Sequence, residues 1–362
     1  MVQDLLRLLV LDKGNRLIMA GQILRSTIKY YSIMLLVALT LCLLGITAAR
    51  ADISQQPNVQ RFINNMVTND GFKKKDLDQL FAQVNFNPKV IEIMTQPLES
   101  KPWYVYQKIL VGEPRISQGV QFWNEHAATL ARAEKEFGVP ANIIVSIIGI
   151  ESNYGRAAGN YSVIDSLSTL AFTYPIPKRS AYFKQELAQF LILSREQKLD
   201  PLKMTGSYAG AIGMPQFMPS SYRKYGIDYS GLHQVNLNSN ADDVIGSIAN
   251  YLSNYGWKRN GAVAMPTSVR NDHYQRLKTD KLAPLYTATQ LGKTGVVIGK
   301  NYPHGQRANL IVLQGETQPV YWLGFNNFYV ITGYNPSNLY ALAVYQLAQA
   351  IAVAHNTPPS KH

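Results

Sequence analysis

The segment Ile143–Ile150 is predominantly apolar, and it constrains this 362-residue chain more than any other feature. Gly138 is typical of the residue that ends a preceding helix, and Pro140 suits a first helical position. The segment is too apolar for a helix at the surface, so we expect a helix buried in a large core. Glu151 follows directly, and the helix stops just after it.

Glu151 is the carboxylate that this helix carries out of the core. Burial disfavours the charged form of a carboxyl group and raises its pKa. A glutamate of this kind keeps its proton near neutral pH and can donate it to a leaving oxygen, so we interpret Glu151 as a catalytic acid. The alternative from this segment alone is a glutamate at a helix end in water.

A second segment, Gly206–Tyr222, is rich in small residues but also carries Ser207, Tyr208 and Gln216. Small residues allow backbone and ligand to approach closely. Polar side chains among small residues are therefore typical of a binding surface.

These segments are part of an ordered series of motifs that resembles the lytic murein transglycosylase B family, relatives of goose-type lysozyme. The resemblance covers roughly residues 56–355, nearly the whole chain after the N-terminal segment. Its motifs are Phe137–Pro140, Glu151–Gly155, Glu186-Leu187, Gly206–Ser221, Ile248–Tyr251, Tyr334-Asn335 with Ser337, and Tyr340-Ala341.

The resemblance implies a mainly α fold, with a lysozyme-like catalytic core, an N-terminal helical segment and a small β-containing subdomain. Apolar residues recur at helical spacing, whereas three short β-branched or aromatic runs predict strands at 308–313, 320–323 and 328–331. The expected helical regions are 56–98, 118–177, 182–199 and 339–354. We expect a signal peptide at 1–51, the helical segment at 52–115, the core at 116–262, the β-containing subdomain at 263–325, and a strand and helix at 326–357 that pack back on the core.

The N-terminus has the pattern of a secretory signal. Ser32–Ala49 is apolar, basic residues precede it, and small residues surround Arg50. We expect cleavage after Ala51, and a retained membrane anchor is the alternative. The only cysteine, Cys42, follows Leu41 inside the apolar stretch, which does not favour lipidation. We therefore expect a soluble protein in the periplasm of a Gram-negative bacterium, with membrane contact only if the segment is retained.

The net charge of +12 predicts an acidic partner. Residues 1–51 carry six basic and two acidic side chains, so the rest of the chain keeps a charge of +8. Peptidoglycan glycan strands, with their peptide carboxylates, fit this charge, and cell-wall synthesis complexes are further possible partners. We expect no nucleic-acid partner, because the longest basic run is Lys73–Lys75 and no nucleic-acid-binding motif is present. A solvated basic surface explains the charge equally well.

Most glycosidases use two carboxylates, but no obvious second one accompanies the motifs. Asp165 and Glu186 lie on helical patterns where capping or surface pairing is expected. The resemblance implies cleavage of the β-1,4 bond between N-acetylmuramic acid and N-acetylglucosamine by one carboxyl, with closure of a 1,6-anhydro ring. A lysozyme-type hydrolase and a non-catalytic murein-binding scaffold are the alternatives.

The resemblance also implies which residues bind the substrate. Ser207 and Gln216 would hydrogen-bond the sugars or the acetamido group. Lys178 and Arg179 match two arginines of the family only after an insertion, and would meet peptide carboxylates. The tyrosines that would line the groove are Tyr106, Tyr251, Tyr334 and Tyr340.

Some relatives bind calcium in an EF-hand-like loop that corresponds to the segment starting at Asp228. Leu232 cannot be a ligand there, His233 stands where a glycine turn is wanted, and Ser239 replaces the expected carboxylate. We therefore expect no metal and no other cofactor; calcium in this loop, with Asp242 or Asp243 as a substitute ligand, is the alternative.

Overall fold

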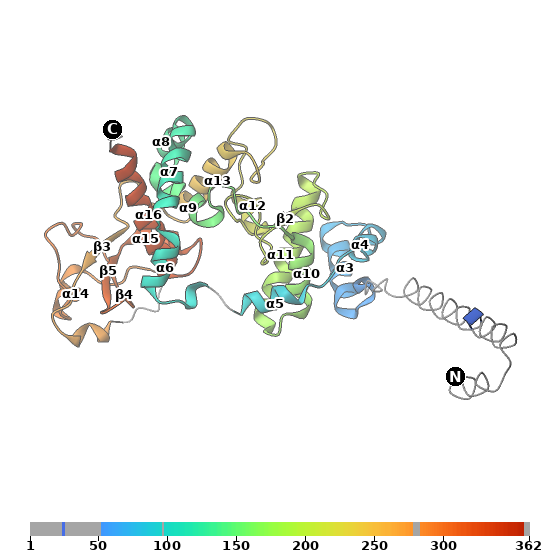
Figure 1. The fold of residues 1–362 in the computed structure, drawn as a ribbon, viewed down its shortest axis with the longest axis horizontal. Coiled ribbons are helices and arrows are strands. Elements are labelled where there is room, and N and C mark those ends of the chain that lie inside the picture. Colours follow the sequence, from blue (N-terminus) through green and yellow to red (C-terminus); the bar gives the residue numbers. More distant parts are fainter. Residues whose placement is uncertain (1–23, 26–51, 96–97, 278–282, 358–362) are drawn as a thin grey trace, which may run out of the picture. The chain divides into compact units, whose positions relative to one another are not determined.

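Helices dominate the fold, which confirms the predicted class. The computed structural model describes residues 24–25, 52–95, 98–277 and 283–357. The elements below belong to the unit Ile53–His362 (Figure 1). The predicted signal peptide lies outside the described residues, apart from residues 24–25.

Short helices form the N-terminal region, as predicted. They are η1 (Ile53–Gln55), α3 (Pro57–Asp70), α4 (Lys74–Phe81), α5 (Pro88–Met94) and η2 (Leu98–Ser100). Gly71 ends α3 in a left-handed conformation, and the Asn87 side chain caps the start of α5. The rings of Phe62 and Phe81 pack against that of Phe172 from α10 (Val163–Thr173), which anchors this region on the next helices.

The central helices surround one buried helix, α9 (Ala141–Ser152) (Figure 1). It contacts α7 (Glu113–Glu125), α8 (Ala127–Phe137), α13 (Ala241–Asn254) and α16 (Asn338–Asn356). Gly138 ends α8 with φ of 74°, as expected, whereas Pro140 is the cap residue of α9, one position before its expected place. The central elements are α6 (Trp103–Leu110), α7 (Glu113–Glu125), α8 (Ala127–Phe137), α10 (Val163–Thr173), α11 (Pro177–Glu196), α12 (Pro219–Tyr225), α13 (Ala241–Asn254) and a two-stranded pair of β1 (Tyr161–Ser162) and β2 (Thr205–Gly206).

A three-stranded antiparallel sheet with strand order β3-β5-β4 has its own small core around Leu291, Leu310 and Phe325. The predicted strands at 308–313 and 320–323 are confirmed. The elements of this region are β3 (Ala264–Thr267), η3 (Asp272–Arg276), α14 (Ala288–Lys293), β4 (Asn309–Leu313) and β5 (Val320–Gly324).

The strand predicted at 328–331 is wrong, because residues Asn326–Thr332 form α15. The aromatic and β-branched residues there reflect burial rather than an extended backbone. Asn327 fixes the start of this helix through hydrogen bonds with the backbone of Lys258 and Gly261. The chain then continues into α16 (Asn338–Asn356), which confirms the predicted closing helix.

Gly149 tests the close packing around α9. A Cβ atom at this position would lie 2.5 Å from the Tyr154 hydroxyl oxygen. We expect Gly149→Ala to destabilise the protein by about 1–3 kcal/mol, because it overpacks a filled site. Thermal melting of the two proteins measures this difference.

Gly292→Ala in α14 is the matched control, because its Cβ atom would meet nothing closer than Ile298 at 3.9 Å. It should be neutral, or stabilising by up to about 1 kcal/mol through helix propensity. Equal melting temperatures for the two alanine variants would contradict the packing argument.

Candidate active site

Glu151 lies in the last turn of α9, where the chain reverses sharply. Asn153, Tyr154 and Gly155 all adopt left-handed conformations, with φ of 49°, 59° and 84°. The Tyr154 hydroxyl donates to the carbonyl of Arg115 at 2.7 Å, which secures this turn to α7. The Glu151 carboxyl is therefore held at the end of a rigid helix and is only partly accessible to solvent.

The Tyr340 hydroxyl, from the first turn of α16, donates a hydrogen bond to Glu151 Oε1 at 2.5 Å. Burial raises the pKa of Glu151 to about 7, while the bond from Tyr340 opposes that rise and the negative charge of Glu99 adds to it. Burial and the nearby Glu151 raise the pKa of Tyr340, so the phenol stays a neutral donor. The predicted pKa shift of Glu151 is thus present.

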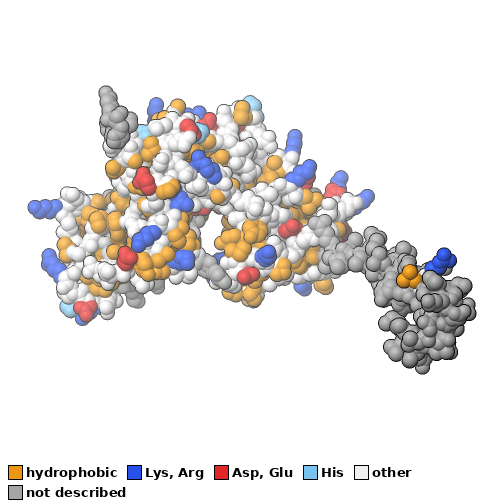
Figure 2. All heavy atoms as spheres, viewed as in Figure 1, with side chains coloured by type: hydrophobic (Ala, Val, Ile, Leu, Met, Phe, Trp, Pro, Cys, Tyr) orange, Lys and Arg blue, Asp and Glu red, His pale blue; other side chains and the backbone are white. Residues whose placement is uncertain are grey.

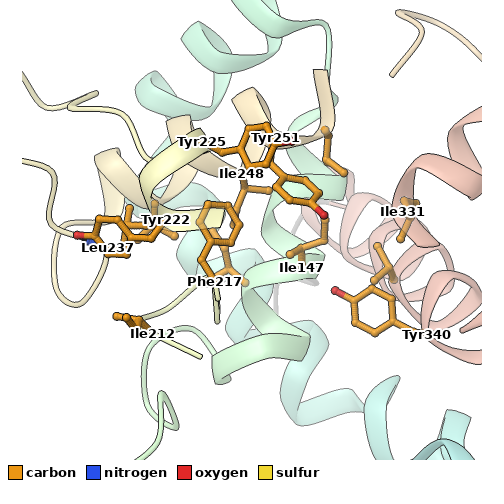
Figure 3. Packing of buried hydrophobic residues seen from close by; sticks show 14 of the residues in the cluster. Ile147, Ile212, Phe217, Tyr222, Tyr225, Leu237, Ile248, Tyr251, Ile331 and Tyr340 are labelled. Carbon is orange, nitrogen blue, oxygen red and sulfur yellow. Dashed lines mark hydrogen bonds between the residues drawn. The ribbon is translucent and has the colours of Figure 1, made fainter. Parts of the chain in front are cut away.

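Three of the four tyrosines predicted around the site, Tyr251, Tyr334 and Tyr340, form a packed aromatic layer. The fourth, Tyr106, is buried on α6 with its ring stacked on Trp103. Tyr334 stacks on Tyr340 with ring centroids 6.4 Å apart, and its hydroxyl donates to the carbonyl of Pro215. Tyr251 is buried against Phe217, as Figure 3 shows, and its hydroxyl donates to the carbonyl of Gly333. Their hydroxyl groups therefore hold the backbone around the site.

Ser207 and Gln216 lie in the compact loop that follows β2, the strand that pairs with β1. The side-chain Nε2 of Gln216 donates to the carbonyls of Ala158 and Gly213, each at 2.8 Å. Its side-chain oxygen is therefore the group that can accept from a ligand. Ser207 Oγ accepts from the amide of Ala211, which leaves the hydroxyl hydrogen as a donor. This loop lies beside the Glu151 turn, because a Cβ atom on Gly155 would meet Met214.

Lys178 and Arg179 are exposed at the start of α11. The guanidinium carbon of Arg179 lies 5.6 Å from the centre of the Phe183 ring. Among the described residues, neither cation forms a hydrogen bond or ion pair with a residue around Glu151. The structure therefore does not join these two residues to the carboxyl group.

Sequence reasoning missed Glu99, a second carboxylate near the site. Glu99 accepts a hydrogen bond from Asn335 Nδ2 at 2.9 Å, and its charge contributes to the raised pKa of Glu151. It lies in the short helix η2 without a periodic pattern, so only its position before the aromatic start of α6 hinted at a role.

Asp165 and Glu186 are structural, as expected. Asp165 accepts from the amide of Asn85. Glu186 is buried rather than at the surface, and it caps the start of α12 through the amide and hydroxyl of Ser220.

The carboxylates of the loop that begins at Asp228 accept hydrogen bonds from donors of the same loop. Asp228 accepts four hydrogen bonds and Asp243 accepts three, from six backbone amides and the Ser230 hydroxyl, at 2.7–3.2 Å. These hydrogen bonds fix the orientation of both carboxylates within the loop. Within the described residues, no group of three or more His, Cys, Asp or Glu side chains is arranged to hold a metal ion.

Comparison with known proteins gives consistent matches. Residues 54–349 match the family described as Transglycosylase SLT domain. The chain is 39% identical over 313 residues to membrane-bound lytic murein transglycosylase B of Escherichia coli K12, covering 84% of this chain and 85% of that protein.

Two solved structures from Pseudomonas aeruginosa are also similar. The catenated lytic transglycosylase SltB1 has 43% identity and a TM-score of 0.79, covering 84% of this chain and 100% of the other. SltB3 in complex with NAG-NAM-pentapeptide has 28% identity and a TM-score of 0.71, covering 85% of this chain and 83% of the other.

The raised pKa of Glu151 predicts a pH-dependent stability. A carboxyl whose pKa rises from 4.5 to about 7 on folding favours the folded state below pH 4.5, and this advantage is lost as the pH rises through 7. Glu151→Gln should therefore be more stable than the parent at pH 8 by about 1–3 kcal/mol, which raises its melting temperature by a few degrees. At pH 4 the two proteins should melt at the same temperature.

Melting curves at pH 4, 6 and 8 measure the difference. Glu113→Gln, at the exposed start of α7, is the control and should leave the pH dependence unchanged. A Glu151→Gln effect of equal size at pH 4 and pH 8 would show that the carboxyl is not held protonated.

Proposed function

The chain belongs to the Transglycosylase SLT domain family and is a lytic murein transglycosylase, and we propose that Glu151 is its single catalytic acid and base. One observation carries the assignment of Glu151. Its carboxyl lies at the end of a buried helix, bonded to Tyr340, with a pKa of about 7. A group with this pKa is substantially protonated at neutral pH and can both give and take a proton.

The proposed reaction has two proton transfers. Protonated Glu151 donates its proton to the oxygen of the β-1,4 bond between N-acetylmuramic acid and N-acetylglucosamine, and the bond to C1 breaks. The carboxylate then accepts the proton of the muramic acid C6 hydroxyl as that oxygen bonds to C1. The product is a 1,6-anhydromuramoyl end, formed without water, and the intramolecular attack has a large entropic advantage.

Tyr340 has a positioning role in this scheme. Its hydroxyl fixes one carboxyl oxygen of Glu151, so the other oxygen is the one that faces the glycosidic bond. The hydrogen bond from Tyr340 also favours the ionised carboxylate and limits the effect of burial. The resulting pKa is close to the pH at which the acid and base forms are needed in turn.

The loop that carries Ser207 and Gln216 supplies the proposed sugar contacts. The Ser207 hydroxyl can donate to an acetamido carbonyl, and the Gln216 carbonyl can accept from a sugar hydroxyl or acetamido N–H. Tyr334 and Tyr251 support this loop as packed rings, because both contact Phe217 and Tyr334 donates to the carbonyl of Pro215. Tyr106 would face the substrate from α6. Lys178 and Arg179 are exposed and can meet the carboxylates of a stem peptide.

We further propose export to the periplasm through the N-terminal segment, with peptidoglycan glycan strands and cell-wall synthesis complexes as partners. The net charge of +12 supports an acidic polymer as partner. On the face drawn in Figure 2, the Lys and Arg side chains are spread out rather than collected in one patch. Within the described residues, no helix combines the length and apolar character required to cross a membrane.

The identity of the cleaved ends tests the reaction. Purified murein digested with the protein should give 1,6-anhydromuramoyl products, identified by mass spectrometry. Glu151→Gln should lower turnover by at least about 1,000-fold while leaving murein binding intact, because it removes the only proton donor. Glu113→Gln is the control.

Two outcomes would contradict the proposal. Reducing muramic acid ends without anhydro ends would favour a lysozyme-type hydrolase. Binding to murein sacculi without product at any pH would favour a scaffold.

We also propose that the enzyme acts without a metal ion, because Asp228 and Asp243 already bind amide donors. Millimolar calcium should change the melting temperature by less than about 1 °C, and a chelator should have no effect. Melting curves in parallel buffers measure this. A rise of several degrees with calcium would show that the loop rearranges to bind it.

A further inference from the structure

Glu99 is a partly buried carboxylate near Glu151 that has no role in the proposed reaction. It lies in η2, directly before α6, and is partly buried. Asn335 Nδ2 donates to its Oε1 atom at 2.9 Å. Asn335 follows Tyr334, whose ring stacks on Tyr340, the residue that binds Glu151. A continuous series of contacts thus joins the two carboxyl groups.

Glu99 is close to the site from a second direction as well. It accepts a hydrogen bond from the Tyr106 hydroxyl of α6, and its charge contributes to the raised pKa of both Tyr106 and Tyr208. Tyr208 belongs to the loop that carries Ser207 and Gln216. Glu99 therefore borders α6, and its charge reaches both the Ser207 loop and the end of α9.

The charged and titratable groups around Glu151 leave the field of Glu99 uncompensated. Tyr340, Tyr334 and Tyr106 face Glu151 as neutral phenols. Arg115 of α7 points its guanidinium at the carbonyls of Gly149 and Ile109. Among the described residues, neither Glu99 nor Glu151 forms an ion pair, so no cation cancels the repulsion between the two carboxylates.

We propose that Glu99 is a positioning residue that acts through Glu151: its negative charge keeps the Glu151 proton in place for the first step, and its bond to Asn335 holds the Tyr334–Tyr340 pair against the carboxyl. The proposal rests on the assignment of Glu151 as the acid. Glu99 does not attack or protonate the substrate in this scheme. It sets the pH range in which Glu151 is protonated.

The proton on Glu151 is the direct readout. Carbon-13 NMR of the whole protein, labelled at glutamate side-chain carboxyls, follows the titration, and Glu151→Gln assigns the signal. Glu99→Gln keeps an oxygen for Asn335 but removes the charge, so the Glu151 midpoint should fall by about half a pH unit, a threefold change in the ionisation ratio. The alkaline limb of kcat/KM on murein should move the same way.

Two variants complete the design. Glu92→Gln removes an equal charge from the exposed face of α5 and should leave the midpoint where it is. Glu99→Asp withdraws the charge by one methylene, so we expect a smaller fall in the midpoint. This variant decides the question by itself if Glu99→Gln does not fold.

An unchanged Glu151 midpoint in folded Glu99→Gln, or in Glu99→Asp where only that variant folds, would overturn the proposal. So would a loss of activity by the same factor at every pH, because that result indicates a purely structural role. The NMR titration does not depend on the products formed. An error in the reaction assignment would therefore appear in the murein digest and leave the Glu99 result interpretable.

Discussion

The complete burial of α9 is the constraint on which the rest of the structure depends. Ile143 to Gly149 are all buried, and α9 is covered by α7, α8, α13 and α16. This packing fixes the helix so firmly that its last turn has one available orientation. Glu151 is therefore placed by the core rather than by a loop, and its carboxyl meets a surrounding of low polarity that raises its pKa.

The aromatic residues around this helix end connect the core to the chemistry. Tyr340 binds the carboxyl, Tyr334 stacks behind it, and Tyr251 fills the space between α13 and the loop after α15. Each of the three hydroxyl groups donates to an acceptor, so the rings can pack as apolar surfaces without leaving a polar group unpaired. Glu99 joins the edge of this layer through Asn335, which connects η2 to the same assembly.

Sequence patterns were sufficient for the main helices, for the buried helix that ends at Glu151 and for two strands of the small sheet, because these depend on periodicity and burial. They failed at Asn326–Thr332, where buried aromatic and β-branched residues resemble a strand but the backbone is helical. They also missed Glu99, since the contact between Glu99 and Asn335 spans 236 residues. The motif resemblance predicted Tyr340 as a groove residue, but its bond to Glu151 depends on the docking of α16 against α9, which no local pattern encodes.

The turn after Glu151 is the second local cost of this site, beside the buried carboxyl, which lowers the stability of the folded protein when it ionises. Asn153 and Tyr154 hold left-handed conformations that are unfavourable for non-glycine residues. Packing must offset this strain, and the Tyr154 hydroxyl bonded to Arg115, together with its ring against Gly149, provides the contact. Because Arg115 also binds the Gly149 carbonyl, one residue of α7 stabilises both the last turn of α9 and the reversal after it. The requirement for a glycine at 149 is therefore a requirement of the active site as much as of the core.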